Sequence, residues 1–222
     1  MAAGRRAARK GRRRLPADAA FLNVPYDAEY EELFLALLAG LSGFALTPRT
    51  TLEIPGSRRR LDRIVRLLRR CRYSFHDLSR VGLDPAPPAT PRFNMPFELG
   101  LAVALGQIHR GRHEWLIFES RPHRLSKSLS DLSGTDEYVH GGTPDGVLRA
   151  LTNAFVWRRH QPTVAELEGI CRDVRAYAAE IKAQLRTESL FEARAFRELV
   201  AAARRSAIRR VASLRDAGRR RR

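Results

Sequence analysis

Short apolar runs alternate with longer amphipathic stretches between residues 19 and 160. The first run, 19–24, reads AAFLNV and ends at a proline, which is typical of a short buried strand. The stretch that follows, 27–43, repeats apolar residues at helical spacing and begins with Asp27, a favourable N-cap residue. This order of one strand and then one helix recurs along the chain.

The same pattern predicts the other elements of this region. In the helix predicted at 57–71, five apolar side chains are expected to face inward: Leu61, Ile64, Val65, Leu67 and Leu68. A proline-rich loop covers 82–93, and a helix begins after it near Asn94. The remaining predicted strands are 44–48, 72–78, 114–120 and 137–140, and the last predicted helix of the region is 143–159.

Strands and helices that alternate in this way favour a parallel sheet, because parallel neighbours need long crossover connections. We expect a flavodoxin-like, doubly wound α/β fold whose parallel sheet has about five strands in the order 2-1-3-4-5. In such a sheet the loops that follow the strands share one edge. Ligands bind at this edge where the strand order reverses, so the predicted site lies at the carboxyl ends of the strands.

Two further segments flank this α/β domain, which we assign to residues 17–160. Residues 1–16 are basic and lack periodicity, which is typical of a disordered arm. Residues 161–222 form a helical extension with a basic tail, in which apolar residues keep a helical period from Val164 onward and a second helical segment covers about 189–217. We expect these helices to form a hairpin that packs on the sheet domain or on a partner chain, including a second copy of this chain.

The net charge of +17 is concentrated at the two ends. Residues 1–14 and 161–222 each carry +7, whereas residues 15–160 carry only +3. Basic ends attract phosphate and acidic surfaces, so non-specific contact with nucleic acid is one interpretation and solvated tails are the other. The central region is nearly balanced, and the excess charge therefore says little about its ligand.

Composition also bears on location and cofactors. No run of about 18 apolar residues occurs, and no apolar segment follows the Arg-rich start, so we expect neither a membrane span nor a secretory signal. Cys71 and Cys171 lie far apart without metal-ligand spacing, which fits free thiols in a reducing cytoplasm. The histidines show no zinc spacing, and neither a dinucleotide-binding fingerprint nor a P-loop occurs, so no metal ion or cofactor is expected.

Acidic and basic residues gather where the predicted strands end. If the fold is as predicted, most of the acids ring one crevice; scattered loop acids and helix caps are the alternative. These acids are Asp27, Glu53, Asp77 and Glu119, with Glu98 in the helix after the third strand. Four arginines lie at the same predicted edge, where they could hold a phosphate or pyrophosphate: Arg80, Arg92, Arg121 and Arg124.

Glu98 is the acid that stability explains least well. It follows Asn94 by four residues, in the predicted first turn of an otherwise apolar helix, where complementing the helix dipole contributes about 0.3–1 kcal/mol. Its neighbours Phe97 and Leu99 are apolar, so we expect a partly buried carboxylate with a raised pKa, which is typical of a catalytic acid. Both a stabilising role and a chemical role fit these residues.

Four stretches of the chain resemble a known group of sequences. They are similar to an uncharacterised bacterial family grouped with the TIR-like and nucleoside 2-deoxyribosyltransferase-like proteins, and the resemblance covers residues 20–157. It implies a flavodoxin-like fold in which a Glu, in the helix after the third strand, cleaves the N-glycosidic bond of a nucleoside or NAD. The four stretches are FLNVPYDAEYEELF (21–34), CRYSFHDLSR (71–80), RFNMPFELGLA (92–102) and ESRPHRLSKSLSDLSGTD (119–136).

Carried over to this chain, the resemblance makes Glu98 the catalytic residue. Asp77 and Ser74, at the end of the third strand, would line the pocket. Met95-Pro96-Phe97 stands where TIR domains often have Trp-Cys, and Arg92-Phe93-Asn94 stands where deoxyribosyltransferases have a Ser/Gly-rich turn. The predicted substrate-binding residues are Asp77, Ser74, Asn94, Asp27, Tyr26, Arg80 and Arg92.

The leading hypothesis is a TIR-like nucleotide-processing domain that cleaves the N-glycosidic bond of NAD or a related nucleotide. The resemblance alone implies a role in bacterial defence or stress signalling. Two alternatives belong to other classes of protein. One is a nucleotide- or nucleic-acid-sensing module without turnover, and the other is a scaffold that oligomerises through its C-terminal helices, with Glu98 as a structural acid.

Overall fold

A five-stranded parallel sheet forms the centre of the protein. The structure is a computed structural model that describes residues 18–54, 56–57, 59–84, 86–108, 112–158 and 160–211, so the predicted arm at 1–16 and the end of the basic tail lie outside it. The strand order is β2-β1-β3-β6-β7, which confirms the predicted flavodoxin-like order. The strands are β1 (Ala19–Asn23), β2 (Thr47–Arg49), β3 (Tyr73–Asp77), β6 (Glu114–Glu119) and β7 (Glu137–Val139).

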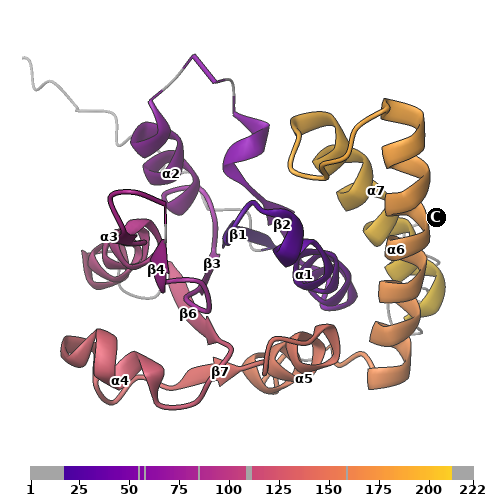
Figure 1. The fold of residues 1–222 in the computed structure, drawn as a ribbon. Helices are drawn as coiled ribbons and strands as arrows, with labels where there is room; N and C mark the ends of the chain where they lie inside the picture. Colours follow the sequence, from indigo (N-terminus) through magenta and orange to yellow (C-terminus); the bar gives the residue numbers. More distant parts are fainter. Residues whose placement is uncertain are drawn as a thin grey trace, which may run out of the picture.

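Helices cover both faces of the sheet (Figure 1). α1 and α5 pack on one face, and α2 and α3 pack on the other. A two-stranded antiparallel hairpin, β4 (Leu83–Asp84) with β5 (Thr90–Pro91), lies within the predicted proline-rich loop. The helices around the sheet are α1 (Glu31–Gly43), α2 (Arg60–Leu68), α3 (Asn94–Ile108), α4 (Arg124–Ser128) and α5 (Pro144–Ala154), with short 3₁₀ turns η1 (Ala28–Tyr30), η2 (Thr51–Glu53) and η3 (Ser130–Leu132).

Alternate residues of β1 face opposite sides of the sheet, as the two-residue period of a strand requires. Ala20 and Leu22 belong to the core that contains α1 and α5, whereas Ala19 and Phe21 belong to the core that contains α2 and α3. The strand is therefore apolar throughout because both of its faces are buried.

The C-terminal extension packs on the sheet domain. Its two helices, α6 (Val164–Leu185) and α7 (Ala193–Arg210), form a hairpin on the outer side of α1 (Figure 1). α1 is consequently enclosed by the sheet on one side and by the hairpin on the other, and eleven of its residues are buried. Glu31 ties the hairpin to the start of α1, because it accepts hydrogen bonds from Lys182 Nζ at 2.7 Å and from the backbone N–H of Leu190 at 3.1 Å.

Several predicted elements differ in extent: α5 ends at Ala154 rather than 159, α7 covers Ala193–Arg210 rather than about 189–217, and β2 and α2 differ as well. β2 occupies residues 47–49 rather than 44–48, because residues 44–46 close α1 instead: Ala45 has a φ of 58° and the N–H of Leu46 donates to Leu41 O at 2.8 Å. α2 is shorter than predicted, and Leu61 is 45% exposed, contrary to the prediction that it faces inward. Leu61 lies in the first turn, at the strand-end edge, whereas Ile64 and the turns after it reach the core.

Candidate functional site

A cleft of about 250 Å³ opens at the carboxyl ends of β1 and β3. The strand order reverses between these two strands, since β2 pairs with the other side of β1, so the cleft lies at the switch point of the sheet. The predicted substrate-binding residues that line it are Tyr26, Asp27, Arg80, Arg92 and Asn94, and the other lining residues are Val24, Pro25, Arg60 and Met95.

Glu98 is not among the residues that line this cleft, but it contacts Arg60, which does line it. The carboxylate is 4% exposed, and its Oε1 lies 3.6 Å from Nη2 of Arg60. Burial raises the pKa of Glu98, and the guanidinium of Arg60 opposes that rise, so the expected partly buried acid with a raised pKa is confirmed. The predicted position in the first turn is wrong, because α3 already begins at Asn94 and Glu98 falls in its second turn.

Tyr26 forms a wall of the cleft and is supported by the C-terminal extension. Its ring stacks on Phe191, with ring centroids 5.3 Å apart and planes inclined by 24°. Its hydroxyl lies 3.3 Å from Thr51 Oγ1. Burial raises the pKa of the Tyr26 phenol, and the charge of Glu98 acts in the same direction, so Tyr26 is a neutral hydrogen-bonding group at pH 7.

Asp27 and Arg80 join the loops that follow β1 and β3. Nη2 of Arg80 lies 3.5 Å from Asp27 Oδ2, and Nη1 of Arg80 donates to Glu29. The other carboxylate oxygen of Asp27 accepts the N–H of Tyr30 at 3.1 Å, which confirms the predicted N-cap. Arg80 is therefore held at the cleft by two acids, and its pKa is raised mainly by the hydrogen bond to Glu29.

Ser74 and Asp77 do not line this cleft. They are three positions apart on β3, so their side chains point to opposite faces of the sheet. Ser74 faces the α2–α3 side and is fully buried, and Asp77 faces the α1–α5 side with 2% exposure. The period of a strand, applied to the sequence, would have separated the two residues.

Asp77 is the acceptor at the centre of a buried polar cluster. It accepts hydrogen bonds from the Tyr30 hydroxyl and from Ser79 N, the latter at 2.8 Å, and its Oδ2 lies 3.3 Å from Nε2 of His140. His140 Nδ1 accepts the N–H of Gly142, which leaves its proton on Nε2, facing Asp77. Burial alone would raise the pKa of Asp77, but these partners, with His140 foremost, lower it on balance. The cluster holds the ends of the strands together.

Ser74 belongs to a chain of hydrogen bonds on the other face. His113 Nδ1 lies 3.1 Å from Cys71 O and must donate to it, so His113 Nε2 accepts from the Ser74 hydroxyl at 2.9 Å. Ser74 Oγ then accepts from His76 Nε2 at 2.9 Å, and His76 Nδ1 accepts from Asn23 Nδ2 at 3.0 Å. Burial lowers the pKa of His76 to about 3, so this ring is neutral, as the direction of the chain requires.

The remaining charged residues predicted at this edge lie outside the cleft. Nη1 of Arg124 donates to Ser79 O at 3.1 Å and lies 3.5 Å from Glu119, and Arg121 is exposed. Nε of Arg49 donates to both carboxylate oxygens of Glu53, at 3.0 and 2.8 Å, on the β2 side of the sheet. These side chains therefore tie loops and strands together, and Arg92, Arg80 and Arg60 remain as the cations of the cleft.

Cysteine and metal chemistry find no support in the described part of the chain. Both cysteines are buried free thiols, and burial raises the pKa of Cys71 to about 12, so it stays protonated at neutral pH. Among the described residues, no three His, Cys, Asp or Glu side chains lie close enough together to hold a metal ion.

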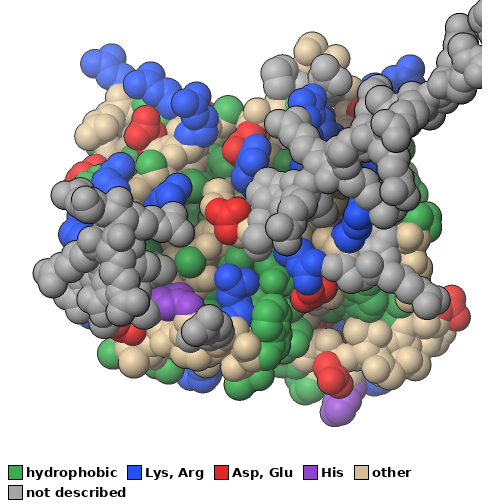
Figure 2. All heavy atoms as spheres, turned by 180° about the vertical axis from the view of Figure 1, so that it is seen from behind, with side chains coloured by type: hydrophobic (Ala, Val, Ile, Leu, Met, Phe, Trp, Pro, Cys, Tyr) green, Lys and Arg blue, Asp and Glu red, His purple; other side chains and the backbone are tan. Residues whose placement is uncertain are grey.

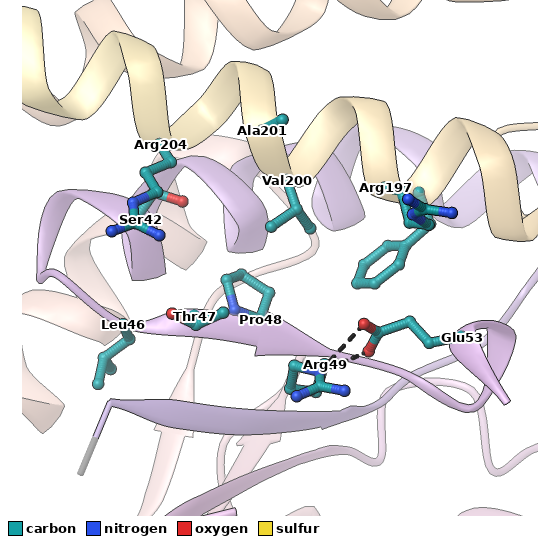
Figure 3. Close-up of a pocket in the computed structure, with 11 residues that line it drawn as sticks. Ser42, Leu46, Thr47, Pro48, Arg49, Glu53, Arg197, Val200, Ala201 and Arg204 are labelled. Carbon is teal, nitrogen blue, oxygen red and sulfur yellow. Dashed lines mark hydrogen bonds and ion pairs between the residues drawn. The ribbon is translucent and has the colours of Figure 1, made fainter. Parts of the chain in front are cut away.

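A groove of about 370 Å³ lies between α7 and the edge strand β2 (Figure 3). Its lining is apolar at Leu46, Pro48 and Val200, and Arg204 and Arg197 lie at its two ends, near Ser42 and Glu53 respectively (Figure 3). Its acid, Glu53, is already paired with Arg49. This groove was not predicted, because it arises only where the extension meets the sheet edge.

On the face shown in Figure 2, the Lys and Arg side chains of the described residues are scattered among acidic and apolar groups. No helix in the described ranges has both the length and the apolar composition needed to cross a bilayer.

The fold and the position of the cleft define a flavodoxin-like α/β protein with a helical hairpin added on one side. Searches against protein-family models, curated proteins and solved structures found no match for this chain.

Proposed function

We propose that the protein binds a nucleotide in the cleft at the ends of β1 and β3 and cleaves its N-glycosidic bond, with NAD or a related nucleotide as substrate. One observation carries the proposal: a carboxylate that is 4% exposed and has a raised pKa, Glu98, contacts Arg60, one of three arginines that line a switch-point cleft. Buried acids beside ligand clefts are typical of catalytic groups.

The proposed chemistry suits a carboxylate in this environment. Departure of nicotinamide or a base leaves positive charge on the anomeric carbon of the ribose. A carboxylate held at low exposure stabilises that charge more strongly than one in water, because the surrounding dielectric is lower. Glu98 can act as such a stabiliser, as a nucleophile or as a proton donor.

The residues that line the cleft can supply the remaining contacts with the substrate. The guanidinium groups of Arg60, Arg80 and Arg92 supply donors for the phosphates of a nucleotide. The neutral hydroxyl of Tyr26 and the amide of Asn94 offer uncharged hydrogen-bonding groups for sugar hydroxyls. A role in bacterial defence or stress signalling follows only from the family resemblance.

The second candidate function is binding without turnover. The observation that favours it is the contact between Glu98 and Arg60, since a carboxylate that is paired with an arginine can position that arginine rather than react. In this case the cleft senses a nucleotide, and the groove between α7 and β2 offers a separate surface for a partner.

Base release tests the two candidates directly. The purified protein is incubated with NAD and with nucleosides, and nicotinamide or base is followed chromatographically. Glu98→Gln keeps the size of the side chain and removes its charge; we expect it to lower release at least about 100-fold. Asp62→Asn, an exposed acid of α2, is the matched control and should leave release unchanged.

The outcomes separate the candidates. Release by the wild type that persists in Glu98→Gln overturns Glu98 as the catalytic residue. Nucleotide binding without release from any substrate favours the sensing module.

A further inference from the structure

Arg60 connects the open cleft with the buried acid Glu98. It is the first residue of α2, it lines the cleft, and its side chain is 53% exposed. Its guanidinium lies 3.6 Å from Glu98, whose side chain is 5% exposed. This separation is longer than a charge-assisted hydrogen bond of about 2.7–2.9 Å, so the guanidinium is attracted to Glu98 without being locked onto it.

Arg60 is also the cation of the cleft that is best placed to change partners. Arg80 is already engaged by Asp27 and Glu29. Among the described residues, Glu98 is the only acid paired with Arg60. A phosphate that enters the cleft offers Arg60 two oxygens in the planar geometry that guanidinium binds best.

We infer that the cleft takes a phosphate-bearing nucleotide rather than a nucleoside, and that the phosphate draws Arg60 away from Glu98, which then takes up a proton from solvent. This inference rests on the proposed site and names its ligand class. The exchange is balanced: one guanidinium–carboxylate pair is replaced by a guanidinium–phosphate pair, and one proton converts the carboxylate to a carboxylic acid.

The proton uptake follows from what surrounds Glu98. α3 packs against α2, β3 and β6. On β3, His76 is neutral because burial lowers its pKa to about 3. On β6, Glu114 pairs with Arg72 and Glu119 with Arg124.

The loop after β1 adds the neutral phenol of Tyr26, whose pKa burial raises, and Asp27, which pairs with Arg80. Within the described part of the chain, Arg60 is the cation that lowers the pKa of Glu98, against the effect of burial. Without it, a charged carboxylate at this depth is more costly, and the pKa of Glu98 rises further.

The exchange gives Glu98 a defined chemical state in the complex. A carboxylic acid can donate its proton to a departing base, which the carboxylate cannot do. Phosphate binding at Arg60 would therefore protonate the neighbouring Glu98, and a nucleoside without phosphate would leave Glu98 paired and charged.

Calorimetric titration with ADP and with adenosine tests the inference in the intact chain. Each titration is run at pH 7 in two buffers that differ in ionisation enthalpy, so that proton uptake is measured together with affinity. We expect ADP to bind at least tenfold more tightly than adenosine and to bring proton uptake that adenosine does not.

Variants of Arg60 and Glu98 test whether these two residues cause the tighter ADP binding and the proton uptake. Arg60→Gln should weaken ADP binding and abolish the uptake, while Arg60→Lys should keep part of both. Glu98→Gln should bind ADP without proton uptake. Arg59→Gln, an exposed arginine next to Arg60, is the matched control and should behave as the wild type.

Several results would overturn the inference. These are equal affinities for ADP and adenosine, no binding of ADP, tight ADP binding without proton uptake, and uptake that survives Arg60→Gln. Failure of the proposed activity looks different: ADP binds with uptake as expected, yet neither NAD nor any nucleotide releases its base.

Discussion

The ring of Tyr26, at the cleft, stacks on the ring of Phe191 in the segment that joins α6 to α7, with the two centroids 5.3 Å apart. Phe191 also contacts Phe34 of α1, at a centroid distance of 5.1 Å. The C-terminal extension thus does more than cover α1. It supports one wall of the cleft from outside the sheet domain.

Phe191→Ala should weaken both the fold and the cleft. Phe191 is half-buried, so we expect the free energy of unfolding to fall by about 2 kcal/mol, less than for a fully buried phenylalanine. The loss of stacking also frees Tyr26, and ADP affinity should fall. Urea denaturation and calorimetry measure the two effects. Phe191→Leu, which keeps apolar volume, should restore most of the stability; unchanged ADP affinity in Phe191→Ala would contradict the role of Phe191 at the cleft.

Glu98 should make stability depend on pH in a defined window. Burial raises its pKa in the folded protein, whereas the unfolded chain keeps the ordinary value of 4.5. Between the two values the unfolded chain releases a proton that the folded protein retains. Stability therefore falls as pH rises from about 4.5 through the raised pKa, and it levels off above that point.

Glu98→Gln removes this dependence. The free energy of unfolding, measured in urea from about pH 4 to pH 7, should consequently fall less steeply with pH in the variant than in the wild type. Asp62→Asn should follow the wild type. Parallel curves for Glu98→Gln and the wild type would mean that Glu98 is not desolvated in the folded protein.

Asp77→Asn should destabilise the protein strongly. The variant places an amide among the donors Tyr30, Ser79 and His140, and we expect a loss of about 3 kcal/mol in the free energy of unfolding. The pKa of Asp77 is lowered in the folded protein, so its stabilisation is present above the ordinary value of 3.8 and is lost as pH falls through the folded-state value. The wild type should lose this stabilisation in acid, and the variant should show no such loss.

Ser74→Ala separates a structural role from a ligand-binding role. The change leaves His76 Nε2 and His113 Nε2 without their shared hydroxyl, and we expect a loss of about 2 kcal/mol in stability. ADP affinity should stay within about twofold of the wild type, because Ser74 is fully buried and outside the cleft. Unchanged stability together with weakened ADP binding would instead support the predicted role of Ser74 in the pocket.

The sequence and the structure agree best where a local pattern repeats. The alternation of strand and helix predicted the order of the five strands, and the apolar neighbours of Glu98 predicted its burial. A signal for Arg60 was also present, because it starts the helix after β2 and such helix starts share the edge where ligands bind. Phe191 gave no such signal, since it comes to the cleft from the extension.

The chain by itself determined the parallel sheet, the helices on both faces and the buried acid after β3, because these follow from periodicities of two and 3.6 residues and from long crossovers. Only the tertiary structure decided which charged groups meet. It pairs Arg60 with Glu98, joins the Tyr30 hydroxyl to Asp77, and sets Phe191 behind Tyr26. Such pairings depend on packing between segments far apart in the sequence, and no local pattern encodes that packing.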